Sequence, residues 1–201
     1  MTGEIKLPHS SGNSVSIAAP EANPAANRTL YLPSNADGTV LTDSTPGAIV
    51  QTVMVYRTTA TQLNKSGAFT ELDTNLRLAI TPKYASSKLL FEVYAPFYYP
   101  NSSNIQYAYI YDITNSSVPA QPPADGSRSR VHWVNRNGPV DANDADLMNF
   151  KVIADASNTT ARTYTIYYRT EGATAQFYVS NLSTDAGATY PAVFTIQEIA
   201  Q

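Results

Sequence analysis

The 201-residue chain contains no cysteine. This absence excludes disulfide bonds, zinc–thiolate sites and cysteine nucleophiles together. If the protein works outside a cell, packing or oligomerisation has to keep it stable, because no covalent crosslink is available.

Charged residues are also scarce, at 14% of the chain, against a usual share of roughly a quarter. The net charge is −3, and lysine and arginine form no cluster. A nucleic-acid partner would require a basic stripe to neutralise its phosphates, so we expect no nucleic-acid binding. Serine, threonine and asparagine supply most of the polar surface, which favours strands joined by turns.

Long hydrophobic runs are missing as well. No apolar run approaches the ~18 residues of a membrane-spanning helix. The N-terminal segment MTGEIKLPHSS lacks the charged and apolar blocks of a secretory signal peptide. We therefore expect a soluble protein that is made in a cytoplasm and does not insert into a membrane.

Short alternating runs are the main feature of the chain from Gly47 onward. Hydrophobic residues make up 43% of the sequence, enough for a core, and turn residues separate the runs. Strict alternation predicts strands at 48–57, 76–81, 88–95, 105–113, 146–153, 161–169, 175–180 and 192–199. In the first run, alternation places Ile49 on the face of Val53 and Val55.

These strands predict an all-β fold. No run has the spacing of an amphipathic helix, and the chain offers about eight to ten strands. We predict an antiparallel β-sandwich head of jelly-roll type, because the longer loops suit crossovers between two sheets.

Residues 1–46 differ in kind from the rest. They contain no aromatic residue except Tyr31, and alanine is their most frequent apolar residue. We interpret them as an extended N-terminal attachment arm or short trimeric stalk, and residues 47–201 as the head. A flexible N-terminal tail is the alternative.

Within the arm, two short alternating runs, Ser14–Ala18 and Thr29–Leu32, predict β-segments that are too poor in apolar residues to form a core. Burial against neighbouring chains or a scaffold would stabilise them. The assembly contacts are therefore assigned to the sizeable apolar side chains Val15, Ile17, Leu30, Leu32, Val40 and Leu41.

Two stretches carry a family resemblance. The arm has a β-run, then APEANPAAN, then a Thr/Leu run and LPSNADGTVL, and this pattern resembles segments common in bacteriophage fibre and appendage proteins. ITPKYASSKLLFEV, at residues 80–93, resembles the entry into the sandwich of phage fibre heads. Together they cover about a fifth of the chain. The stalk unit occurs once, so any shaft must be very short.

The resemblance implies a non-enzymatic virion protein that forms a short homotrimeric fibre or spike. Its partners would be copies of itself, other tail or capsid proteins and a host cell-surface glycan. The protein would be located in the virion, assembled in the host cytoplasm. A capsid decoration or cement protein is one alternative, and a carbohydrate-binding lectin or glycan-active enzyme is another.

Tyrosine is the one strong excess, with fourteen residues. The run IQYAYIYDI places on one side Ile105, Tyr107, Tyr109, Tyr111 and Ile113. Aromatic rings with hydroxyl tips suit sugar recognition and protein interfaces alike, while core and cross-strand packing is expected to account for most of them. A proline-bounded loop supplies the candidate receptor surface, which a trimer interface or the core could also use: Tyr98, Tyr99, Asn101 and Asn104.

Candidate catalytic and metal-binding residues are few. A Ser-His-Asp triad could run only through His132, and no G-x-S-x-G motif supports a nucleophile, so His132 is expected in a strand beside Trp133. The run DANDAD offers Asp141, Asp144 and Asp146 as calcium ligands, but it lacks the glycine and distal glutamate of an EF-hand loop. We expect a solvated loop there, and neither metal nor cofactor.

Overall fold

The computed structural model describes residues 4–8, 10–12, 14–18, 45–58, 61–65, 67–98, 105–136, 145–171, 175–179 and 191–201. The chain divides into two compact units, residues 1–40 and 41–201. None of the described residues belongs to a helix long and apolar enough to cross a membrane.

The smaller unit contains a two-stranded β-hairpin. Its strands, β1 (Glu4–Pro8) and β2 (Ser14–Ala18), are antiparallel, with Ile5 opposite Ile17 and Leu7 opposite Val15. The turn between them includes Gly12, whose φ of 97° favours glycine. Leu7 remains 53% exposed. A hairpin of this size is at best marginally stable alone in water.

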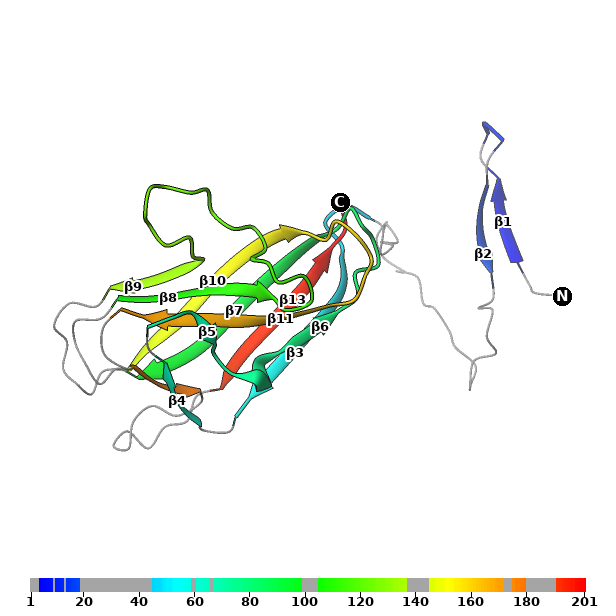
Figure 1. Cartoon of the computed structure of the whole chain (residues 1–201). Coiled ribbons are helices and arrows are strands. Elements are labelled where there is room, and N and C mark those ends of the chain that lie inside the picture. The colour runs from blue at the N-terminus through cyan, green and yellow to red at the C-terminus, as the bar shows by residue number, and fades with distance from the viewer. Residues whose placement is uncertain are drawn as a thin grey trace. The chain divides into compact units, whose positions relative to one another are not determined.

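The larger unit is built from two antiparallel sheets (Figure 1). The first has the order β10-β7-β13-β3 and consists of β3 (Ile49–Arg57), β7 (Lys88–Tyr98), β10 (Ala145–Asp155) and β13 (Ala192–Ile199). The second has the order β5-β11-β8-β9, with β6 also on β11, and consists of β5 (Thr70–Glu71), β6 (Leu78–Ile80), β8 (Ile105–Asp112), β9 (Trp133–Arg136) and β11 (Arg162–Thr170).

Two smaller elements accompany the sheets. A separate ladder pairs β4 (Thr61–Lys65) with β12 (Ala175–Val179). A 3-10 helix, η1 (Thr74–Leu76), lies between β5 and β6. The Asp73 side chain caps it by accepting a hydrogen bond from the backbone N–H of Asn75 at 2.9 Å. Leu76 therefore lies in a helical turn, and the predicted strand start at this residue is wrong.

The strand order is that of a jelly roll. β5 and β6 pair with successive parts of β11 and act as one interrupted strand, so the two sheets supply eight main strands. Along the chain, the first main strand, β3, pairs with the last, β13. The second, β5 with β6, pairs with the seventh, β11. The third, β7, pairs with the sixth, β10, and the fourth, β8, pairs with the fifth, β9. Rolling one long antiparallel hairpin into two sheets produces this nesting. The predicted all-β jelly-roll sandwich is confirmed.

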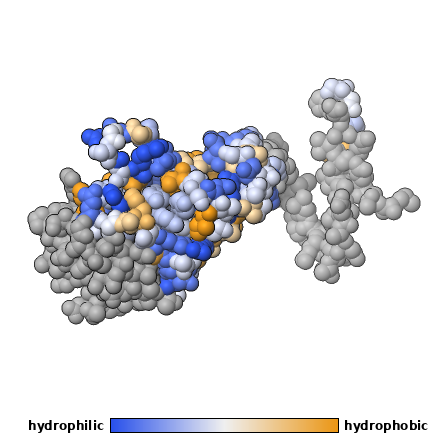
Figure 2. Space-filling model, viewed as in Figure 1, coloured by the Kyte–Doolittle hydropathy of each residue, from blue (hydrophilic) through white to orange (hydrophobic). Residues whose placement is uncertain are grey.

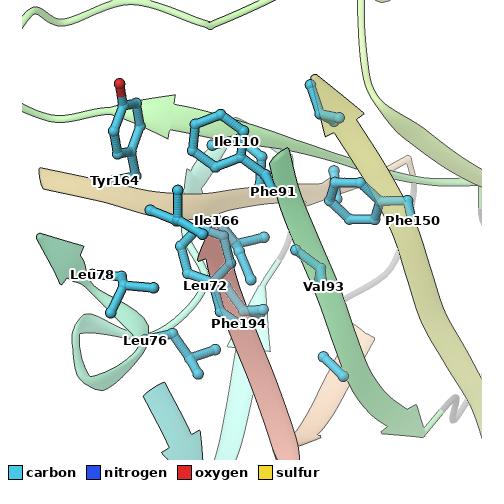
Figure 3. Packing of buried hydrophobic residues seen from close by; sticks show 14 of the residues in the cluster. Leu72, Leu76, Leu78, Phe91, Val93, Ile110, Phe150, Tyr164, Ile166 and Phe194 are labelled. Atoms are coloured by element: carbon cyan, nitrogen blue, oxygen red, sulfur yellow. The ribbon is translucent and has the colours of Figure 1, made fainter. Parts of the chain in front are cut away.

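The core lies between the inner faces of the two sheets (Figure 3). Phe91 on β7 and Phe194 on β13 are fully buried, and they face Ile110 and Ile166 from the other sheet. The Phe91 ring meets Tyr164 edge-on, with 4.8 Å between the ring centroids. Each such side chain contributes roughly 1.5–3 kcal/mol when fully buried, so this cluster is the main stabilising feature of the sandwich.

A β-bulge changes the face predicted for the start of β3. Glu198 is opposite Gln51, whereas Ile199 is opposite Ile49, so β3 has one extra residue at this point. Because side chains alternate with a period of two, the extra residue moves everything before it to the other face. Val53 and Val55 pack against the core, but Ile49 is 57% exposed, so its predicted place on the same face as these two valines is wrong.

The tyrosines of β8 point away from the core. Its buried side chains are Gln106, Ala108, Ile110 and Asp112, whereas the alternate residues are half-exposed. Tyr164 and Tyr168 on β11 are buried, as expected of core tyrosines. Core packing therefore does not account for the tyrosines of β8, whose aromatic side forms an outer surface. The cross-strand packing that was also expected is present, because Tyr109 and Tyr111 contact Tyr167 of β11.

Glu198 is a buried carboxylate that fixes the segment before β7. It accepts hydrogen bonds from the backbone N–H groups of Lys83 and Tyr84 at 2.9 to 3.0 Å and from Nε2 of Gln51 at 2.6 Å. Burial raises the pKa of Glu198, but these hydrogen bonds lower it by more, so the pKa lies below its ordinary value. The segment therefore depends on an ionised carboxylate.

Candidate functional site

The arm residues predicted from the sequence are described only in part. Val15 and Ile17 lie in β2, opposite Leu7 and Ile5 of β1. The other four predicted assembly residues lie outside the described residues: Leu30, Leu32, Val40 and Leu41. The role of all six in assembly stays a prediction.

The predicted receptor loop begins where β7 ends. Tyr98 is the last residue of that strand, and its backbone is opposite Ala145 of β10. Tyr99, Asn101 and Asn104 lie outside the described residues. Their exposure and their role in binding therefore stay predictions.

Most of the acidic run lies outside the described residues. Asp141 and Asp144 lie outside the described residues, and Asp146 lies in β10 opposite Phe97. The described part of the chain holds no group of three histidine, cysteine, aspartate or glutamate residues that could bind a metal ion.

His132 lies just before β9, rather than in the strand as predicted, and its ring takes part in packing. Its Nδ1 accepts a hydrogen bond from the backbone N–H of Ile110 at 3.1 Å, and its ring centroid lies 6.4 Å from that of Phe150. Burial lowers the pKa of His132, and the backbone carbonyls of Ala120 and Pro119 only partly oppose this effect. A neutral, hydrogen-bonded ring fits the expected packing role.

The outer surface of the second sheet carries a cluster of aromatic side chains, here called the aromatic face: Phe69, Tyr107, Tyr109, Tyr111 and Tyr167. Tyr167 on β11 stacks on Tyr111, with 4.2 Å between ring centroids, and on Tyr109, with 5.8 Å. Phe69 continues the cluster at 4.6 Å from Tyr109. Such contacts contribute about 0.5–1.5 kcal/mol per pair beyond area burial, so the rings hold one another in place.

Arg169 closes one end of the aromatic face. Its guanidinium lies over the rings of Phe69 and Tyr107, at 4.9 and 4.6 Å from their centroids. One of its nitrogens, Nη2, also donates to Oγ of Ser129 at 2.6 Å and to Oε1 of Glu171 at 3.3 Å. Arginine is suited to this position, because its planar guanidinium combines stacking on rings with directional hydrogen bonds.

A cleft of about 390 Å³ lies beside this arginine. Val134 on β9, Tyr107 on β8 and Arg169 on β11 are directly opposite one another across three neighbouring strands, and all three line it. Glu171 and the loop residues before β9 complete the walls. We call this hollow the Arg169 cleft.

Hydrogen bonds within the Arg169 cleft hold its polar groups together and keep the Tyr107 hydroxyl protonated. The Tyr107 hydroxyl donates to Oε1 of Glu171 at 2.8 Å. Burial and the hydrogen bond to Glu171 raise the pKa of Tyr107, so it remains protonated at neutral pH. Glu171 thus accepts from both Tyr107 and Arg169 and is still 49% exposed at its side chain. The cleft offers an accessible carboxylate next to a held guanidinium.

Sequence reasoning missed the Arg169 cleft. It selected the tyrosines as a group but placed the candidate binding surface on the loop after Tyr98. The row of Val134, Tyr107 and Arg169 depends on strand register, which alternation within one strand does not define. The concentration of tyrosine in YAYIY pointed to this sheet.

Comparisons with known proteins identify no family. No family model matches the chain, and no curated protein matches it. Solved structures resemble it at low identity. A structure of the Gt strain of infectious bursal disease virus is 12% identical, with a TM-score of 0.46, over 94% of this chain and 48% of that chain.

Two further structures of infectious bursal disease virus proteins resemble the chain at similarly low identity. The VP2 subviral particle is 14% identical, with a TM-score of 0.45, over 94% of this chain and 48% of that one. The derived T=1 particles are 13% identical, with a TM-score of 0.43, over 94% and 46%. The chain spans about half the length of these proteins. The likeness concerns the course of the backbone alone.

Proposed function

We propose that the protein is a non-enzymatic structural protein of a bacteriophage virion. Residues 1–46 would attach it to the particle, and the head would project as a short fibre or spike. The resemblance of the arm and of residues 80–93 to phage fibre and appendage proteins supports this role. The observation that carries it is the position of the arm connection and of Tyr98 at opposite ends of one strand.

The first end of the head is defined by the chain entry. The backbone N–H of Gly47 donates to the carbonyl oxygen of Ala200 at 2.8 Å, and Ile199 is opposite both Ile49 and Lys88. The arm therefore joins the head next to the start of β7.

The second end is defined by the end of β7. This strand has 11 residues, so Tyr98 lies about 33 Å from Lys88 at a rise of ~3.3 Å per residue. The Arg169 cleft belongs to this second end, because the backbone N–H of Glu171 donates to the carbonyl of Ile105, where β8 begins. Anchoring the chain where it enters the head would thus leave the far end of β7 and the Arg169 cleft facing a host surface.

The arm hairpin supports attachment through contacts with other chains. It has five residues per strand and leaves Leu7 half-exposed, and ordering each residue costs about 1–2 kcal/mol in backbone entropy. Its apolar side chains become stabilising only when other surfaces cover them. Two further copies of the arm, or a virion scaffold, would supply those surfaces.

We expect the purified full-length protein to sediment as a trimer at micromolar concentration, with little difference between low and high salt. Only 14% of its residues are charged, and exposed ion pairs contribute about 0–1 kcal/mol each, so apolar and aromatic contacts would hold the trimer. Sedimentation velocity at two salt concentrations measures this. A monomer in both buffers would contradict a trimer of the purified protein. Dissociation of the trimer by salt would contradict an interface held by apolar contacts.

Replacing Tyr98 and Tyr99 together by alanine is expected to weaken binding to host cells and to leave the melting temperature nearly unchanged. The reason is that β7 ends at Tyr98, at the end opposite to Gly47, where the chain enters the head. The measurement pairs a cell-binding assay with thermal unfolding. A large fall in melting temperature would instead assign both rings to the core or to an interface.

Cryo-electron microscopy of the complete particle tests the proposed location. Density for the jelly roll on a tail or baseplate, with the arm at the particle surface, is the expected result. Density on the capsid shell would favour a decoration or cement protein instead. Absence from the particle, together with turnover of a glycan substrate by the purified protein, would support the lectin or enzyme alternative.

A further inference from the structure

The Arg169 cleft combines three kinds of group. It has an aromatic ring, an apolar side chain that is 56% exposed at Val134, and a paired carboxylate and guanidinium. Its volume of about 390 Å³ is at the lower end of the range of roughly 300–1,000 Å³ that is typical of ligand sites. A ligand of small size therefore fits best.

The polar groups of the cleft can serve a ligand that both donates and accepts hydrogen bonds. The Glu171 carboxylate is acceptor-only and has lone pairs beyond those that Tyr107 and Arg169 use. The Arg169 guanidinium is donor-only, and the Ser129 hydroxyl can do both. Neighbouring hydroxyl groups of a sugar match such a pair, because each hydroxyl donates one hydrogen bond and accepts others.

The apolar groups lie in the same row of the sheet. Val134 is opposite Tyr107, and Val131 joins them in the lining. A sugar ring is amphipathic, with C–H groups on its faces and hydroxyls around its edge. Its C–H face would cover Val134 and the accessible part of Tyr107, while its hydroxyls would reach Glu171 and Arg169.

The two ion pairs at the cleft favour a neutral ligand over an acidic one. Arg169 is paired with Glu171, and Arg128 at the rim is paired with Asp125 at 2.5 Å. The charges within each of these two ion pairs cancel, and the whole chain carries a net charge of −3. An anion would therefore meet no uncompensated positive charge from these pairs and no favourable long-range field.

The described surface of the molecule is mixed in hydropathy. In the view of Figure 2, small hydrophobic patches interrupt a largely hydrophilic surface over the described residues. We propose that the Arg169 cleft binds one residue of a neutral glycan. The assignment of this ligand to a host surface rests on the proposed function, whereas the binding itself does not.

The test is a ligand-observed NMR titration of the full chain with methyl glycosides of glucose, galactose, mannose and N-acetylglucosamine. At least one of them is expected to bind with a dissociation constant in the millimolar range. Val134→Arg should weaken that binding at least about tenfold, because its side chain would occupy the cleft. Glu171→Ala removes the acceptor from an exposed position and should have an effect of the same size.

Ile153→Arg is the matched control, because Ile153 is 58% exposed on the first sheet and receives the same side chain away from the cleft. It should bind the glycoside like the unaltered protein. Glucuronate, N-acetylneuraminate and sulfate are titrated in parallel. Binding of these anions alone, absence of any neutral binding, or unchanged binding in both cleft variants would each overturn the proposal.

Failure of this proposal is distinguishable from failure of the proposed function. A protein that enters particles through its arm but binds no neutral glycoside would keep its structural role and lose the glycan site. A protein that binds the glycoside through the cleft but is absent from every particle would keep the site and lose the virion role.

Discussion

Removal of residues 1–44 is expected to abolish incorporation of the protein into virions while leaving a folded head. The large sheets, with their core of Phe91, Phe194 and their neighbours, lie entirely in the unit 41–201. Thr45 should be kept, because its carbonyl accepts a hydrogen bond from Ala48 at 2.9 Å at the entry to β3. The measurements are circular dichroism, thermal unfolding and immunodetection in purified particles.

A control for the truncation keeps the arm but weakens its apolar contacts. Val15→Ser with Ile17→Ser preserves the chain length and should reduce incorporation with little effect on the melting temperature of the head. If the truncated protein is instead unfolded or insoluble, the arm is an integral part of the sandwich. Normal incorporation of a folded truncated head would equally contradict attachment through the arm.

The second large effect is expected at Glu198. Glu198→Gln should lower the free energy of unfolding by about 1–3 kcal/mol, because a buried amide would turn a donor group toward donors and leave some of them unsatisfied. The donors concerned are the N–H groups of Lys83 and Tyr84 and Nε2 of Gln51. Denaturant unfolding at neutral pH measures the loss.

The pH dependence of that loss has a defined sign. The pKa of Glu198 in the folded protein lies below its ordinary value of 4.5, so the unfolded state binds its proton more readily. The contribution of Glu198 is therefore fully present above pH 4.5 and is lost as the pH falls through the folded-state pKa. Glu198→Gln and the unaltered protein should thus converge in stability at acidic pH.

Glu92→Gln provides the matched control on the first sheet. Glu92 forms an ion pair with Lys151, whose side chain is 66% exposed, so its loss should change stability by no more than about 1 kcal/mol. Equal stability losses in the two variants at neutral pH, or a Glu198 effect that grows as the pH falls, would contradict the role assigned to the buried carboxylate.

The fold class and most of the strands follow from the pattern of residues along the chain. Alternation is a local property, so seven of the eight predicted strand runs, 48–57 and 88–95 among them, overlap the observed strands throughout most of their length. The eighth, 76–81, begins instead in η1. The short strands β5 and β9 were not predicted, because their sequences alternate little. They form because β5 pairs with β11 and β9 pairs with β8.

Which side of each strand faces the core depends on the packing of the two sheets against each other. On β8 the tyrosine side was the more apolar choice, yet Ala108 and Ile110 point inward, because the bulky Tyr164, Phe91 and Phe194 already fill the space between the sheets. Alternation has a period of two and does not distinguish the two faces, so the opposing sheet selects the smaller side.

The same reason explains the candidate site. Val134, Tyr107 and Arg169 are far apart in sequence and meet because β9, β8 and β11 are neighbours in one register. Composition indicated an excess of tyrosine in this chain, but the Arg169 cleft depends on the nested strand pairing of a jelly roll. That pairing is a property of the whole head, and no local stretch of residues encodes it.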